Sequence, residues 1–84
     1  MNITLKYFSW IRVKLKKSHD LIELNQKTNF KDLKNNLILK DPIFQEIFED
    51  DSVKYFLNLK EINDENQTLN NGDILAFLPP VTGG

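Results

Sequence analysis

The sequence predicts an α+β fold, in which a mixed sheet carries one main helix, a short helix and an extended C-terminal tail. Three observations predict it. Apolar and polar residues alternate near the start of the chain and again in its second half, as in half-buried strands. A capped helical pattern lies between these stretches, and the chain closes on Pro-Pro-Val-Thr-Gly-Gly. We therefore expect one domain at 1–78 and a tail at 79–84.

Length and charge limit the classes of function. A domain of 84 residues buries only roughly 60–65% of its unfolded surface, so an enclosed catalytic cleft is not expected. Eleven basic and twelve acidic residues leave a net charge of -1, which disfavours general nucleic-acid binding. No apolar run approaches the ~18 residues that span a bilayer, and the start lacks the pattern of a signal peptide. We expect a cytoplasmic protein with no nucleic-acid or membrane partner.

The chain contains no cysteine. Disulfides, thiolate metal sites and cysteine nucleophiles are therefore excluded together. His19 is the only histidine, so a histidine-based triad or metal site is not expected either.

The first predicted element is a strand at 3–8, where apolar residues alternate with Thr4 and Lys6. We expect residues 9–12 to end this strand and residues 14–19 to form a turn. A second short strand at 21–24 then pairs back on the first as a hairpin.

The main helix is predicted to begin after Asn29, a capping residue followed by Asp32 at the positive end of the helix dipole. Phe30, Leu33 and Leu37 fall on one face, the expected core face. A second start signal follows at residues 41–42, an aspartate before a proline. The short helix that it opens carries an apolar stripe of Ile43, Phe44, Ile47 and Phe48.

Three further strands complete the prediction. Residues 53–58 alternate, residues 59–62 form a short strand, and the turn at 70–73 leads into the apolar stretch 74–78. Because that last stretch is apolar throughout, we expect a central strand covered on both faces. The ubiquitin-like β-grasp, with the first and last strands adjacent, accommodates this order. A ferredoxin-like sandwich is the alternative, but residues 63–73 are too polar for its second long helix.

The tail is the expected functional segment. Pro79 and Pro80 end the last strand at Leu78 and keep the chain extended. Gly83 and Gly84 carry no Cβ, so they can enter a narrow channel and present the carboxylate of Gly84 to another protein. Six extended residues span about 20 Å. The alternative is an ordinary chain end without a role.

Four stretches together identify a family: Tyr-Phe-Ser-Trp-Ile-Arg at 7–12, Leu-Asn at 57–58, Asn-Gly-Asp at 71–73, and Phe-Leu-Pro-Pro-Val-Thr-Gly-Gly at 77–84. With them the chain resembles the small subunits of molybdopterin synthase, the MoaD-type members of the MoaD/ThiS family of ubiquitin-like sulfur carriers. The last stretch is the most specific of the four.

The resemblance implies a non-catalytic, sulfur-carrying subunit of a heteromeric sulfurtransferase. An ATP-dependent adenylating enzyme would convert the Gly84 carboxylate to an acyl-adenylate, and a sulfur donor would then produce a thiocarboxylate. The synthase large subunit would receive the tail, residues Pro79, Pro80, Val81, Thr82 and Gly83. Sulfur would pass there to precursor Z. No cofactor would be bound permanently, since ATP is used by the partner.

Strand parity predicts where a partner docks. If Ile3 and its alternates face the helix, Phe8 and Phe56 point to the outer face, and Leu78 joins them. These three side chains would form an exposed apolar patch at the root of the tail, and such patches mark partner surfaces. Phe8 and Leu78 also match family contact positions. The alternative is that local loops cover them.

Three other functions remain open from the sequence. The chain could carry sulfur for another pathway, such as thiamine or sulfur amino acid synthesis. It could be a ubiquitin-like protein modifier whose Gly84 forms isopeptide bonds with lysines. Finally, it could be a plain β-grasp interaction module with an inert terminus.

Overall fold

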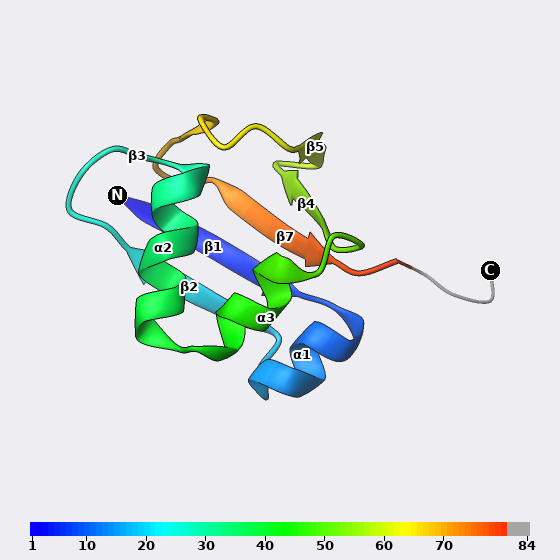
Figure 1. Cartoon of the computed structure of the whole chain (residues 1–84). Helices are drawn as coiled ribbons and strands as arrows, with labels where there is room; N and C mark the ends of the chain where they lie inside the picture. Colours follow the sequence, from blue (N-terminus) through cyan, green and yellow to red (C-terminus); the bar gives the residue numbers. More distant parts are fainter. Residues whose placement is uncertain (81–84) are drawn as a thin grey trace.

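Alternating strand residues and three short helical stripes build one layered domain. The computed structural model describes residues 1–80, in which three helices and a five-stranded mixed sheet share a single core (Figure 1). The elements run in the order β1 Asn2–Tyr7, α1 Ser9–Leu15, β2 His19–Glu23, β3 Thr28–Asn29, α2 Phe30–Lys40, α3 Ile43–Glu49, β4 Lys54–Leu57, β5 Lys60–Ile62, β6 Thr68–Leu69 and β7 Ile74–Leu78.

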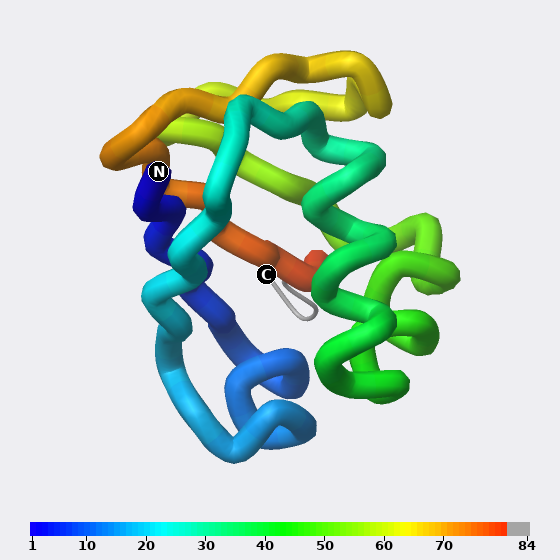
Figure 2. Tube along the Cα trace, turned by 90° about the vertical axis from the view of Figure 1, so that its left-hand side faces the viewer, coloured from blue at the N-terminus to red at the C-terminus, as the bar shows by residue number. Residues whose placement is uncertain are grey.

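The sheet has the strand order β2-β1-β7-β4-β5. β1 and β7 pair in parallel at its centre, with Tyr7 opposite Phe77, and the other pairs are antiparallel. Figure 2 shows α2 and α3 gathered on one side of these two central strands. This is the ubiquitin-like β-grasp that the sequence predicts. Because β1 and β7 are parallel, α1 and the tail both start at the same end of the sheet.

Both predicted helices are confirmed, although α3 begins at Ile43, with Pro42 at its N-cap rather than at the predicted first helical position. The Asn29 side-chain oxygen accepts a hydrogen bond from the Asp32 amide at 2.9 Å, which satisfies one free donor of the first turn of α2. An Asp41 carboxylate oxygen accepts from the Ile43 amide at 3.0 Å, where α3 begins. None of the helices within residues 1–80 is long and apolar enough to cross a membrane.

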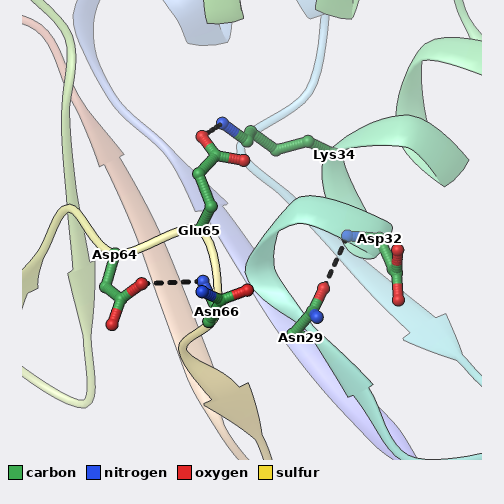
Figure 3. A network of polar contacts seen from close by, with 6 residues as sticks. All are labelled: Asn29, Asp32, Lys34, Asp64, Glu65 and Asn66. Carbon is green, nitrogen blue, oxygen red and sulfur yellow. Dashed lines mark hydrogen bonds and ion pairs between the residues drawn. The ribbon is translucent and has the colours of Figure 1, made fainter.

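The polar loop before β6 is fastened to α2 (Figure 3). Lys34 forms an ion pair with Glu65, and the Asp64 carboxylate accepts from the Asn66 amide at 2.8 Å. The Phe30 amide donates to the Gln67 carbonyl at 2.9 Å. Beside this loop the two-residue strands β3 and β6 form a ladder that the sequence analysis did not predict.

The prediction for residues 9–19 is wrong, because α1 occupies the predicted strand end at 9–12 and the first two residues of the predicted turn, and β2 already begins at His19. Ile11 and Leu15 lie four residues apart, so they fall on one helical face, and both are buried. No side chain caps the start of α1, and left-handed backbone at Lys16 ends it. Burial of these two side chains therefore stabilises α1, although no side chain caps its first turn.

The expectation that β7 is covered on both faces is also wrong. Leu75 and Phe77 are fully buried on the helical side, together with Ile3, Leu5 and Tyr7 of β1, as strand parity predicts. Ile74 is exposed, and Ala76 and Leu78 are half-buried on the opposite face. Apolar residues on that face are therefore not explained by the core.

Candidate docking face and tail exit

The tail leaves the sheet at the end of its central strand. β7 stops at Leu78, Pro79 is buried, and Pro80 is exposed. Leu78 lies opposite Lys54 of β4 on one side, while on the other side β1 ends opposite Phe77. The roles predicted for Val81, Thr82, Gly83 and Gly84 fall outside the residues that the structure describes.

An apolar groove of about 380 Å³ lies on the open face of the sheet, along β7. The three side chains predicted as a patch, Phe8, Phe56 and Leu78, all line it. Register explains why they meet: Phe56 lies opposite Ala76, and Phe8 follows the Tyr7 that pairs with Phe77. Phe8 keeps 41% of its surface exposed, so loops do not cover it.

The groove also contains residues that the sequence analysis did not select. Its remaining lining is Lys6, Asn58, Leu59, Ile74 and Ala76. Ile74 and Ala76 share strand parity with Leu78, so the same rule that placed Leu78 outward could have found them. Leu59 comes from a turn, where parity gives no signal.

A buried carboxylate fixes the end of the groove farthest from the tail. Asp73 accepts hydrogen bonds from the Asn58 side-chain amide at 2.9 Å and from the Asn70 backbone amide at 2.7 Å. The Asn58 side-chain oxygen in turn accepts from the Ile74 amide at 2.9 Å. These bonds join the turn between β4 and β5 to the start of β7, so this part of the groove is preorganised.

The shifted ionisations in the described residues belong to structural groups. Burial and the hydrogen bond to Asp20 raise the pKa of Tyr7, whose hydroxyl donates to Asp20 at 2.7 Å. Burial likewise raises the pKa of Tyr55. Hydrogen bonds from Ser52 lower the pKa of the Asp50 carboxyl. Each tyrosine therefore stays protonated at neutral pH, and neither lines the groove.

Other surface features of the described residues lie away from the groove. Within residues 1–80 no group of histidine, cysteine, aspartate or glutamate side chains could hold a metal ion. A larger and more polar hollow, of about 710 Å³, lies between residues 23–28 and α2, away from the groove. His19 is exposed on β2 beside the Ser18 hydroxyl and lies outside the groove.

Comparisons with known proteins agree with this arrangement. The ThiS family model matches residues 5–84. No curated protein sequence gives a significant match.

Solved structures match over nearly the whole chain. Subunit 1 in the complex of subunits 1 and 2 of molybdopterin-converting factor from Helicobacter pylori 26695 is 25% identical, with a TM-score of 0.71 and 100% coverage of both chains. SAMP1 from Haloferax volcanii is 20% identical, with a TM-score of 0.82 and 100% coverage of both chains. A Pyrococcus furiosus chain, provisionally named molybdopterin converting factor subunit 1, is 24% identical, with a TM-score of 0.81 over 96% of this chain and 99% of that one.

The fold and the family match together define a ubiquitin-like sulfur carrier of the ThiS and MoaD type. The chain belongs to the ThiS family, whose model spans all but its first four residues.

Proposed function

We propose that this protein is the sulfur carrier of molybdenum cofactor biosynthesis and acts as the small subunit of molybdopterin synthase. The observation that carries the proposal is the exit of a Pro-Pro-Val-Thr-Gly-Gly tail from the central strand beside an exposed apolar groove. The similarity to subunit 1 of the Helicobacter pylori molybdopterin-converting factor supports the choice of pathway.

The chemistry takes place on the carboxylate of Gly84. A carboxylate is a poor electrophile, so the adenylating partner first transfers AMP from ATP to one of its oxygens, and pyrophosphate leaves. Sulfur at the oxidation level of hydrosulfide, delivered by a sulfur donor, then attacks the carbonyl carbon and gives up its proton, and the bond to AMP breaks. AMP carries that oxygen away and leaves a thiocarboxylate. Because the chain has no cysteine, it cannot carry sulfur as a persulfide, which supports a role for the terminus.

The chain supplies docking and delivery, while its partners supply catalysis. Phe8, Phe56 and Leu78 bind the synthase large subunit, whose active site takes in Pro80, Val81, Thr82 and Gly83 behind Gly84. Pro79, predicted from the sequence as part of the inserted tail, is buried in this chain and stays at the root of the tail. There the thiocarboxylate sulfur passes to precursor Z. ATP binds to the adenylating enzyme, and this chain needs no permanent cofactor.

Protein modification is the second candidate, favoured by the similarity to SAMP1, a small archaeal modifier protein. In that case Gly84 would form isopeptide bonds with lysine side chains. A sulfur carrier of another pathway is the third. Covalent conjugates on lysines of cellular proteins would identify a modifier, and the partner that copurifies would distinguish one sulfur pathway from another.

The intact mass of the chain, isolated from its own cells, tests the proposal. We expect a fraction whose mass corresponds to replacement of one oxygen by sulfur at the terminus. Deleting Gly84 should abolish this fraction and all sulfur transfer to precursor Z, while the circular dichroism spectrum stays unchanged. Lys31→Ala, on the exposed face of α2, is the control and should transfer sulfur normally. Full transfer by the chain without Gly84 would reject the proposal.

A further inference from the structure

The turn between β4 and β5 holds Leu59 in an unusual backbone conformation, with its side chain in solvent. β4 and β5 pair with Leu57 opposite Lys60, so Asn58 and Leu59 form a two-residue hairpin turn. Both have left-handed backbone, with φ of 50° at Asn58 and 74° at Leu59. Leu59 also exposes 96% of its surface.

This conformation is unfavourable for leucine. Two-residue hairpin turns with positive φ at both positions favour asparagine followed by glycine, because a Cβ crowds the backbone at the second position. Asn58 fits that preference, but Leu59 stands where glycine fits best. Since its side chain is almost entirely in solvent, packing within the described fold does not compensate for the strain. Strain of this kind persists where it serves a function.

Hydrogen bonds hold the turn in place. The Asn58 amide donates to the Ile74 carbonyl at 2.8 Å, and its side chain bonds both the buried Asp73 carboxylate and the Ile74 amide. The turn therefore projects Leu59 in a fixed direction, which lowers the entropy lost when that side chain is buried by a partner.

Leu59 forms one end of the apolar groove, and the tail leaves from the other. Leu57, next to the turn, lies opposite Leu75 near the start of β7, whereas Leu78 at the end of β7 lies opposite Lys54. Phe8 lies at that same end, after β1. A protein that receives the tail and covers the groove must therefore reach Leu59 as well.

We propose that Leu59 is an anchor residue that inserts into an apolar pocket of the synthase large subunit. This inference rests on the proposed function, because it names a contact of the same sulfur-accepting partner. The complex is held at two points, the tail at one end of the groove and Leu59 at the other. With both ends fixed, the sheet cannot rotate about the tail, so the end of β7 at Leu78, where the tail begins, keeps one orientation toward the partner.

The experiment measures separately how Leu59 affects the stability of the fold and how it affects the affinity for the large subunit. Leu59→Gly should raise the thermal unfolding midpoint by about 3–6 °C, because glycine accepts the left-handed backbone. The same variant should bind the large subunit from the same organism about 10-fold or more weakly, as measured by calorimetric titration. Leu59→Asn, which tolerates this backbone and is polar, should lose affinity similarly. Leu39→Ala is the matched control, because Leu39 is 85% exposed on α2, outside the groove.

Each other outcome overturns a particular claim. If the unmodified chain does not bind the large subunit, both the proposed function and the anchor fail. If it binds, and Leu59→Gly binds equally well, the anchor alone is rejected. Unchanged binding combined with slower adenylation would assign Leu59 to the adenylating enzyme instead. Unchanged binding combined with loss of self-association, measured by sedimentation of the chain alone, would assign Leu59 to a contact between copies of the chain.

Discussion

The two faces of the sheet are built from alternate residues of the same strands, but they differ in what covers them. On the helical face, Leu75 and Phe77 of β7 are fully buried. On the open face, Ile74 is exposed and Leu78 is half-buried, and both line a groove. Hydrophobic burial accounts for apolar residues on the first face. On the second face they need another explanation, and a partner protein provides one.

Substitutions on the two faces should therefore separate folding from binding. A change on the helical face should alter the free energy of unfolding and affect binding only through loss of folded protein. A change on the open face should alter affinity and leave the free energy of unfolding nearly constant. Four substitutions test this separation.

The largest effect is expected for Phe77→Ala. The ring of Phe77 is fully buried, and its centroid lies 5.3 Å from those of Tyr7 and Tyr55. Its removal leaves a cavity and should lower the free energy of unfolding by about 3–5 kcal/mol, measured by urea denaturation. Phe77→Leu, which preserves more volume, should cost less and keeps the measurement possible if the alanine variant does not fold. A loss below about 1 kcal/mol for Phe77→Ala would contradict this description of the core.

On the open face, Phe8→Asp should weaken binding to the large subunit about 10-fold or more, because a carboxylate would be buried in an apolar contact. Its free energy of unfolding should change by less than about 1 kcal/mol, since Phe8 is already 41% exposed. Val13→Asp is the matched control: Val13 is 72% exposed on α1 and lies outside the groove, so its affinity should be unchanged. If the unchanged protein, Phe8→Asp and Val13→Asp all bound the large subunit with equal affinity, the groove would not be a docking face.

Asp73 connects the two faces, because its carboxylate is buried but holds the turn that carries Leu59. Asp73→Ala leaves the donors of Asn58 and Asn70 without their acceptor and should lower the free energy of unfolding by about 1–3 kcal/mol. It should also weaken binding, because the anchor is no longer held in one direction. Thermal unfolding measures the loss of stability, and calorimetric titration of the same sample measures the loss of affinity for the large subunit. Lower stability with undiminished affinity would indicate that Leu59 needs no preorganisation.

The parts of the fold that sequence predicts well are those with a local physical signal. Alternation places Ile3, Leu5 and Tyr7 inward, and the capping residue Asn29 marks the start of α2. α1 lacks such a signal, because only Ile11 and Leu15 form its buried stripe within a strongly basic stretch. Contacts with the rest of the core select the helix, and these contacts are not local in sequence.

The candidate site divides in the same way. Parity places Phe8, Phe56 and Leu78 on one face without knowledge of the strand order, but a groove forms only because β7 lies between β1 and β4. The position of the Leu59 side chain depends on the backbone of a turn. An Asn-Leu pair in a sequence does not predict left-handed backbone at the leucine. The contact between Asn58 and Asp73 joins residues 15 positions apart, so it becomes visible only with the fold.

The smallest effect is expected for Lys16→Gly, which makes the same kind of backbone change as Leu59→Gly but outside the groove. Lys16 ends α1 with φ of 62°, a left-handed position that glycine commonly occupies after a helix. Lys16→Gly should raise the free energy of unfolding by about 0.5–1 kcal/mol, measured by urea denaturation, because it relieves the same strain as Leu59→Gly. Lys16 does not line the groove, so affinity for the large subunit should stay constant. If Lys16→Gly lost affinity as Leu59→Gly is expected to, the loss would follow from backbone relaxation rather than from removal of an anchor.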